Sequence, residues 1–258
     1  DAIGFGTDVM ELPTADGSAN QVLKTDGSGN LDWVADSGAS ALNNLSDVLI
    51  EATSSMYIGN DPESTTDGAN YNLGIGVTTL DAITTGDGNI AVGHDALTAN
   101  TTGEKNLAIG KGALDAADTE SNNIAIGYDA LGGAVAGGEF NVAIGNNALD
   151  ALTSGDSNIA VGHDALTAHT TGHRNLAIGI GALDAADTEN DNIAIGYDAL
   201  GGAVAEGEFN VAIGNYSLDA LTAGDYNVAV GDNTLSANTT GSYNTAIGGW
   251  ALNANTTG

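Results

Sequence analysis

A repeat of seventeen residues constrains this chain more than any other feature of its sequence. The string Asn-x-Ala-(Ile/Val)-Gly, once with Gly in place of Ala, recurs eleven times at intervals of 17 or, in two places, 18 residues. A unit this short cannot bury its apolar side chains alone, so such chains fold by stacking each unit on the next. The units begin at Asn72, Asn89, Asn106, Asn123, Asn141, Asn158, Asn175, Asn192, Asn210, Asn227 and Asn244, and the eleventh is incomplete, so we expect the array to continue.

A longer period lies on top of the short one. Residues 86–154 and 155–223 align without a gap over 69 positions and differ at eleven of them. With the repeat asparagine numbered 0, every difference falls at +5 to +7 or at +11 to +16. We therefore expect those positions to face solvent and the constant ones to build the structure.

The pattern within one unit predicts a short strand, a turn and a second apolar segment. Positions +1 and +3 carry Ile, Leu or Val almost everywhere, with Ala between them, which is the alternation of a strand. Gly at +4 allows a sharp turn, and Leu recurs at +8. The prediction is an all-β chain: a parallel β-solenoid of about eleven 17-residue coils over residues 72–258, roughly 50 Å long at about 4.8 Å per coil.

The alternation also predicts which side chains are inside. We expect the large aliphatic side chains at +1 and +3 to fill the coil, with Ile90, Leu107, Ile124 and Val142 in one buried column. The small residues at 0, +2 and +4 would then face outward and let chains pack closely against one another. This arrangement predicts a homotrimer.

Residues 1–71 precede the repeat and are expected to form a β-hairpin-containing connector or cap. Residues 21–24 and 31–34 are short alternating runs around an Asp-Gly turn, which indicates a hairpin. Residues 48–50 and 56–58 read as two more strands, and the solenoid is expected to start within the polar stretch 61–70.

Composition excludes several classes of function. The chain has 34 acidic and four basic residues, a formal net charge of −30. A nucleic-acid partner is therefore not expected, because such binding needs a basic face. The sequence contains no run of eighteen apolar residues, so membrane insertion is not predicted. There is no cysteine for a disulfide or a thiolate metal site.

Aspartates alternate between two positions of the repeat. This alternation would keep like charges apart in adjacent coils, and it offers hard oxygen ligands. No cofactor is predicted, with Ca²⁺ on the acidic surface as the alternative. Asp occupies +9 in Asp81, Asp115, Asp150, Asp184 and Asp219, and +6 in Asp95, Asp129, Asp164 and Asp198.

Nothing in the sequence predicts catalysis or a metal site, so we expect no enzyme. His94 and His163 share position +5 four coils apart, and His169 with His173 fall in one loop, so all four are interpreted as surface histidines. An axial metal in a trimer is the alternative. The Gly-x-Gly strings, such as 110–112, lie at repeat turns and not between a buried strand and a helix, so they do not predict nucleotide binding.

Aromatic residues give the one candidate binding surface. Phe209, Tyr226 and Tyr243 each precede a repeat asparagine in consecutive coils and should stack in a column, while Tyr216 and Trp250 share position +6. The first interpretation is a structural ladder or a contact within a trimer. The second is a strip that binds glycan rings on its aromatic faces.

The repeat motif resembles a known architecture. Residues 89–93 and 106–110 resemble the head repeats of trimeric autotransporter adhesins, whose heads are left-handed parallel β-rolls joined as trimers and whose repeat is near fourteen residues. The longer units, such as 89–103 and 244–258, are similar to repeats in tail-fibre proteins of marine bacteriophages. Residues 12–34 also resemble a segment common in phage fibres.

The resemblance implies a structural and adhesive rod of a virion tail fibre that projects or forms a host-recognition element. It would act as a homotrimer on a virion tail and meet a host cell-surface glycan or protein. The alternative is a bacterial cell-surface adhesin or a self-assembling extracellular filament.

Overall fold

The computed structural model describes residues 2–5, 8–11, 21–25, 31–35, 48–50, 55–58, 68–133, 138–202 and 207–258, with side chains described from residue 55 onward. The chain divides into two compact units, residues 1–50 and residues 51–258. All regular elements among the described residues are strands, so the all-β prediction is confirmed.

The first unit contains two antiparallel hairpins and one further strand. β1 (Ala2–Phe5) pairs with β2 (Asp8–Glu11), which the sequence analysis did not predict. β3 (Gln21–Thr25) pairs with β4 (Leu31–Ala35), so the predicted hairpin is confirmed. β5 (Val48–Ile50) is the last strand of this unit.

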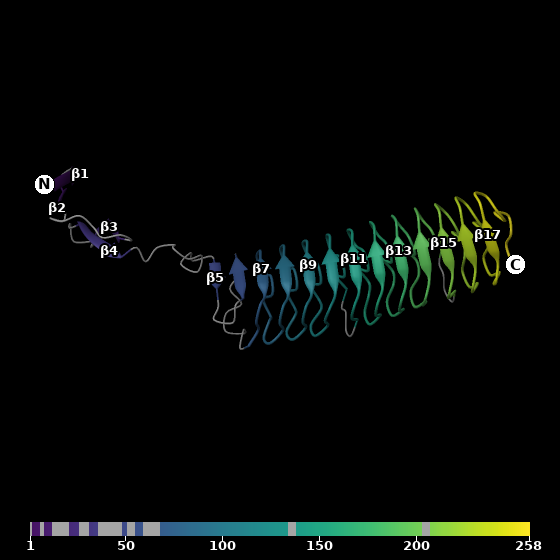
Figure 1. The fold of residues 1–258 in the computed structure, drawn as a ribbon, viewed down its shortest axis with the longest axis horizontal. Helices are drawn as coiled ribbons and strands as arrows, with labels where there is room; N and C mark the ends of the chain where they lie inside the picture. The colour runs from purple at the N-terminus through teal and green to yellow at the C-terminus, as the bar shows by residue number, and fades with distance from the viewer. Residues whose placement is uncertain are drawn as a thin grey trace. The chain divides into compact units, whose positions relative to one another are not determined.

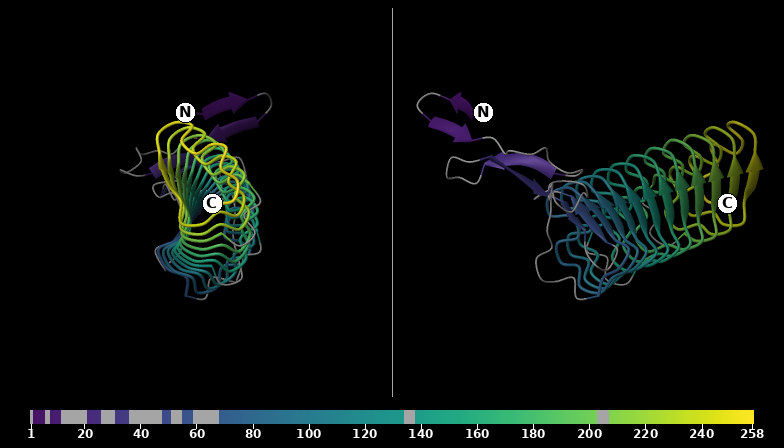
Figure 2. Two further views of the ribbon diagram at one scale, coloured as in Figure 1. Left: turned by 90° about the vertical axis from the view of Figure 1, so that its right-hand side faces the viewer. Right: turned by 60° about the vertical axis from the view of Figure 1, so that its left-hand side comes forward.

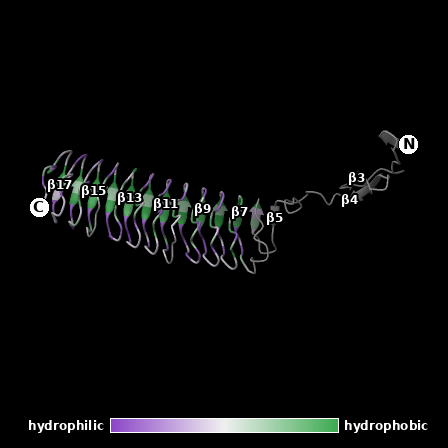
Figure 3. Cartoon of the chain, turned by 180° about the vertical axis from the view of Figure 1, so that it is seen from behind, coloured by the Kyte–Doolittle hydropathy of each residue, from purple (hydrophilic) through white to green (hydrophobic). Residues whose placement is uncertain are grey.

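The second unit is a parallel β-solenoid in which successive coils each contribute one three-residue strand to a single sheet (Figure 1). The strands occupy positions +1 to +3 of the repeat, and the connections between them carry the polar residues (Figure 3). Its twelve strands are β6 (Met56–Ile58), β7 (Leu73–Ile75), β8 (Ile90–Val92), β9 (Leu107–Ile109), β10 (Ile124–Ile126), β11 (Val142–Ile144), β12 (Ile159–Val161), β13 (Leu176–Ile178), β14 (Ile193–Ile195), β15 (Val211–Ile213), β16 (Val228–Val230) and β17 (Thr245–Ile247).

The register between coils keeps equivalent residues side by side. Ile90 pairs with Leu107, Leu107 with Ile124, and Ile124 with Val142, so these four form one column, but it is not the buried column that was predicted, since Ile90 is 40% exposed. The two 18-residue units stay in register because their extra residue falls between Leu131 and Gly138 and between Leu200 and Gly207. Seen end on, the coils overlie one another and turn gradually along the stack (Figure 2).

Within the second unit, the parallel sheet begins with β6, one strand before the repeat and earlier than the predicted start within residues 61–70. β6 pairs with β7, and Tyr57 lies beside Gly74 in the register. A Cβ on Gly74 would lie 2.9 Å from the Tyr57 ring, whose side chain is fully buried. This contact explains why the first repeat has Gly where the other units have Ala.

The predicted sidedness of the sheet is wrong, because the small residues are inside. In every strand from β7 to β17 the middle residue is buried, while neither +1 nor +3 is. Leu at +8 is fully buried in the coils up to Leu235. A coil of seventeen residues encloses little volume, so Leu at +8 fills it and leaves room only for Ala on the sheet side.

The repeat asparagines form a ladder inside the coils and do not face outward as expected. From Asn72 to Asn227, each Asn Oδ1 accepts the backbone N–H of the next repeat asparagine at 2.7 to 3.0 Å. The Nδ2 groups of the repeat asparagines Asn72 to Asn227 each donate to a backbone carbonyl of the same coil at 2.7 to 2.9 Å. The acceptor is the residue at +14, or at +15 in the two 18-residue units. Buried amides need such partners, which explains why the repeat keeps Asn at position 0.

Two turn positions have a left-handed backbone for different reasons. Gly at +4 is required twice over: at Gly110 φ is 140°, and a Cβ there would lie 2.0 Å from the Gly127 carbonyl oxygen. Leu at +8 also has φ between 48° and 54° in all eleven coils. A left-handed Leu costs about 1–2 kcal/mol. Ten of these leucines are fully buried, but Leu252 keeps the conformation while 52% exposed, so burial alone does not hold it.

Candidate functional site

The largest feature open to solvent is the outer face of the sheet in the second unit. Its residues are those at +1 and +3 of each coil, and all are Ile, Leu or Val except Thr245. Several are more than one-third exposed, among them Ile90 at 40%, Ile109 at 38% and Ile178 at 38%. We call this surface the aliphatic face. It carries no charged residue, although the chain as a whole has 34 acidic ones.

One border of the aliphatic face is formed by the residues at −1, just before each strand. Each non-glycine residue at this position has a positive φ. Phe209 and Tyr226 stack with ring centroids 4.9 Å apart and planes at 6°, and Tyr226 and Tyr243 stack at 5.2 Å and 6°. The predicted column is therefore confirmed. Because stacked rings cover one another's faces, the column presents ring edges to solvent.

The other two candidate aromatics do not join this column. Tyr216, at +6, contacts Tyr197 of the preceding coil edge to face at 5.3 Å. The carboxylate of Asp198 and the neighbouring Tyr216 raise the pKa of Tyr197. Trp250 is 62% exposed and is separated from Tyr216 by a coil that has Asn233 at the same position. A glycan-binding role for the five aromatics stays a prediction.

The second border of the aliphatic face is position +5, directly after the turn glycine, and the basic side chains of the solenoid lie at −1 or +5. Lys105 and Arg174 occupy −1, and Arg174 binds Asp191 of the next coil through two contacts of 2.7 Å. Lys111, at +5, lies 5.5 Å from the centre of the Tyr128 ring. His94 and His163, also at +5, are each about half exposed, as predicted, and contact Asp95 and Asp164.

The aspartates at +6 and +9 face one another between adjacent coils, so their alternation does not remove the repulsion as expected. Burial and then the carboxylates of Asp129, Asp95 and Asp150 raise the pKa of Asp115. Burial and the neighbouring Asp129 and Asp164 likewise raise the pKa of Asp150. We call this row the acidic rim. Its remaining members with a raised pKa are Asp184 and Asp219.

The rim does not by itself make a metal site. Among the residues that the structure describes, no three His, Asp or Glu side chains are grouped so that they could hold a metal ion. Calcium on the acidic surface stays a prediction. Within the same residues, no helix is long and apolar enough to cross a bilayer.

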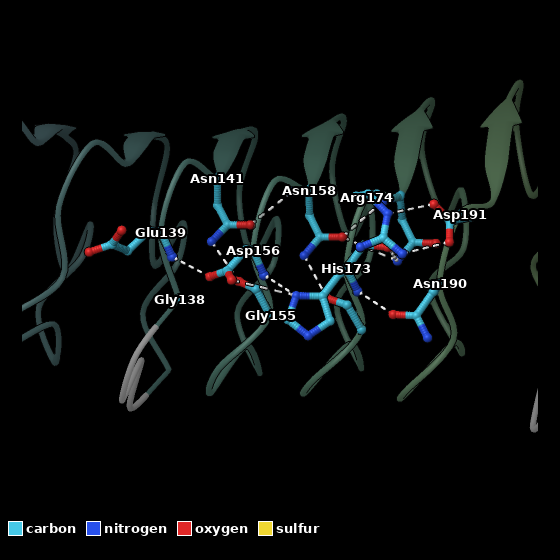
Figure 4. Close-up of polar contacts among 12 residues, drawn as sticks. Gly138, Glu139, Asn141, Gly155, Asp156, Asn158, His173, Arg174, Asn190 and Asp191 are labelled. Atoms are coloured by element: carbon cyan, nitrogen blue, oxygen red, sulfur yellow. Dashed lines mark hydrogen bonds and ion pairs between the residues drawn. The ribbon is translucent and has the colours of Figure 1, made fainter.

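A second side-chain ladder runs along the positions two residues before each asparagine (Figure 4). Here the backbone N–H of one coil donates to the side chain of the next: Glu139 to Asp156 at 2.8 Å, Asp156 to His173 Nδ1 at 2.9 Å, and His173 to Asn190 at 2.8 Å. It runs opposite to the asparagine ladder, whose acceptors belong to the preceding coil. Side chains at this position therefore link coils and are not only solvent-facing.

The expectation that the two 69-residue copies differ only at solvent-facing positions is wrong in two places. Asn100 and its counterpart His169 are both fully buried, and so is Ser217, the counterpart of the buried Ala148. His169 is thus not a surface histidine. The signal was present in the sequence, because position +11 is apolar in several other coils, as at Ile83, Leu152 and Leu221.

Comparisons with protein-family models, with curated proteins and with solved structures find no match to this chain. The arrangement of its own residues therefore carries the functional argument. What the second unit offers chemically is a long apolar sheet face, two borders with aromatic and basic side chains, and an acidic rim.

Proposed function

We propose that this chain is a rod segment of a virion tail fibre, assembled from three copies that meet through the aliphatic face. The fibre would project or form a host-recognition element that meets a cell-surface glycan or protein. The observation that carries the proposal is the absence of charge from the aliphatic face of a chain whose net charge is −30. Surfaces depleted of charge and rich in aliphatic side chains are those that proteins bury in stable interfaces.

The size of the aliphatic face supports association. Eleven coils at about 4.8 Å give a strip about 50 Å long, and a width of about 15 Å gives on the order of 750 Å² per chain. This area matches one partner's share of a standard interface. Closed threefold symmetry limits the assembly and suits a fibre on a rotationally symmetric tail.

The contact differs from the one expected from the sequence. Ala on the inner face cannot meet another chain, because Ala at +2 is buried within each coil. The trimer is therefore proposed through Ile, Leu and Val. The cations Lys105, Lys111 and Arg174 at the borders would then lie where they can meet acidic groups of a neighbouring copy.

The mass in solution tests the assembly. Light scattering should give three times the 25.5 kDa chain mass. The double variant Ile109→Lys, Ile178→Lys changes two equivalent residues of the aliphatic face and should give monomers with an unchanged far-UV CD spectrum. The control Thr102→Lys, Thr171→Lys adds the same charge at exposed positions in the turns and should leave the trimer intact. The proposal is refuted if the wild type is a monomer, or if the Ile109→Lys, Ile178→Lys variant is still a trimer.

A cell-surface adhesin or a self-assembling extracellular filament is the second candidate, and the repeat architecture supports it equally. The genes beside the coding sequence separate the two: tail and baseplate genes support the fibre, and secretion genes support the adhesin. For the filament, electron microscopy should show fibres that lengthen with protein concentration, whereas the proposed trimer has one length.

A further inference from the structure

One coil of the solenoid carries two histidines in positions where its internal copy carries none. The coil opened by Asn158 has His169 and His173, and the equivalent residues 69 positions earlier are Asn100 and Glu104. The copies otherwise differ at few positions, so the first copy is a built-in control for any property that these histidines confer.

His169 is fully buried, and its ring takes the place of an amide that closes the turn in the copy. Asn100 closes its turn by accepting the Gly103 N–H at 3.0 Å and donating to the Gly103 carbonyl at 3.1 Å. Asn238 makes the same pair of bonds with Gly241. In the coil opened by Asn158, the His169 ring lies against Gly172 instead: a Cβ on this glycine would be 2.2 Å from its Cε1.

The His169 ring lies against the asparagine ladder. Asn175 Nδ2 lies 3.2 Å from His169 Nε2 and also donates to the Glu189 carbonyl at 2.8 Å and to Asn158 Oδ1 at 3.1 Å. The Asn175 Oδ1 accepts the Asn192 N–H, so the NH2 group is the side of this amide that faces the ring. An imidazolium carries a proton on both ring nitrogens. Protonation of His169 would therefore place an N–H donor against the Asn175 NH2 group inside the asparagine ladder.

His173 is constrained in a complementary way. Its Nδ1 accepts the backbone N–H of Asp156, and its own N–H donates to Asn190 (Figure 4). The Asp156 carboxylate lies 3.7 Å from the same ring nitrogen. His173 is thus part of the second ladder, whereas His169 is the histidine buried inside the coil.

The charges that face His169 do not offset its burial. Burial is the largest influence and lowers the pKa of His169. The backbone groups of Gly172 and Ala186 and the carboxylate of Asp187 in the next coil act in the opposite direction, and the nearby His173 lowers the pKa slightly further, so the net pKa is lowered. Asp191 in that coil is paired with Arg174, and Glu189 Oε2 accepts two backbone N–H groups. The folded chain therefore holds His169 neutral, while the unfolded chain binds a proton below pH of about 6.5.

We infer that the coil opened by Asn158 is an acid-sensitive joint, which opens in preference to its copy when His169 takes up a proton. Stability contributed by neutral His169 is complete above the unfolded pKa. It is lost as the pH falls below that value, because the unfolded state then binds the extra proton. Opening here would interrupt the asparagine ladder and the second ladder at one point along the rod.

Hydrogen exchange of the full chain tests the inference. Peptides covering residues 158–175 and 89–106 are compared at pH 7.5 and pH 5.5, with rates corrected for the intrinsic pH dependence. We expect the protection of 158–175 to fall by about tenfold for each pH unit below about 6.5, until the pH reaches the folded pKa, and therefore by up to about tenfold at pH 5.5. The copy at 89–106 should keep its protection.

Two substitutions exchange the roles of the coils. His169→Asn restores the residue of the copy and should abolish the acid response of 158–175. The reverse change, Asn100→His, should create an acid response in 89–106. The inference is overturned if both coils respond equally in the wild type, or if 158–175 remains acid-sensitive in His169→Asn.

Discussion

The two faces of the solenoid sheet differ in the opposite sense to most half-buried sheets. The inner face has Asn, Ala and Gly, and the Ala and Asn side chains are buried. The outer face has Ile, Leu and Val, and each is at least partly exposed. Hydrophobicity alone would put the large residues inside. The available volume decides instead, because the inner face must share a narrow coil with Leu at +8. The aliphatic side chains left outside are then free for association.

Enlarging the inner face should have the largest effect on stability. Replacing Ala125 and Ala194 with Leu adds volume to two coils that are already filled, and overpacking of this kind costs about 1–3 kcal/mol per site. We expect the double variant to lose about 2–6 kcal/mol. Urea unfolding followed by far-UV CD measures the loss.

The outer face supplies the control for this prediction. Ile126→Leu with Ile195→Leu changes the neighbouring residues of the same strands without a change in volume. We expect a cost below about 1.5 kcal/mol per site, as for volume-conserving exchanges. Equal losses in the two double variants would contradict the assignment of the faces.

Breaking the asparagine ladder should have the next largest effect. Asn158 Oδ1 accepts the Asn175 N–H at 3.0 Å, and its Nδ2 donates to the Gly172 carbonyl at 2.8 Å. Asn158→Ala leaves both partners buried and unsatisfied, at about 1–3 kcal/mol each. We expect a loss of about 2–6 kcal/mol in urea unfolding.

Asn146 makes a comparable bond on the outside of the rod. Its Oδ1 accepts the Tyr128 N–H at 3.1 Å, but the side chain is exposed and water can replace it. Asn146→Ala should cost about 0.5 kcal/mol. A loss as large as that of Asn158→Ala would mean that burial does not distinguish the two bonds.

The period, the parallel register and the hairpin could be predicted from sequence because each depends on local spacing. The Gly turn at +4 and the strand at +1 to +3 follow from the same spacing. The sidedness could not be predicted, since both faces of the alternating pattern are apolar and a shift of one residue exchanges them. The number of large residues at +1 and +3 favoured the wrong face.

The buried polar groups were harder to predict for a different reason. Asn at position 0 is compatible with a turn, an outer face or an inner ladder, and only the three-dimensional path of the coil places its amide between backbone groups. His169 was assigned to the surface by residue type. Its position, +11, carries Ile, Ala or Leu in other coils, and that comparison would have indicated burial. The column of Phe209, Tyr226 and Tyr243 was predictable because the register alone creates it.

The aromatic column should contribute less than either ladder. Phe209 stacks on Tyr226, whereas its counterpart Phe140 has Ser157 in the next coil. Phe209→Ala should therefore cost about 0.5–1.5 kcal/mol more than Phe140→Ala in urea unfolding. Equal costs would mean that the stacking contributes nothing to stability.

The same two variants address glycan binding. Rings in a stack cover each other's faces, so a column that serves only the structure predicts that Phe209→Ala leaves any glycan signal unchanged. A glycan array with wild type and both variants measures this. Loss of a glycan signal in Phe209→Ala alone would assign binding to the column.

The smallest expected effects come from single charges on the outer surface, and their sign depends on the neighbours. Asp150 lies in the acidic rim, where burial and the carboxylates of Asp129 and Asp164 raise its pKa. The folded chain therefore binds this proton more readily than the unfolded chain, and the stability contributed by its protonation rises as the pH falls through the raised pKa. Asp150→Asn removes the repulsion and should stabilise the rod by about 0.2–1 kcal/mol at low salt and neutral pH.

Asp191 is the opposite case, because its contact with Arg174 lowers its pKa, so Asp191→Asn should destabilise. Thermal unfolding should show both effects shrinking in half-molar salt, where the Debye length is only a few ångströms. A destabilising Asp150→Asn, or a gain that persists unchanged in high salt, would mean that the rim carboxylates are held by a partner or an ion and do not simply repel one another.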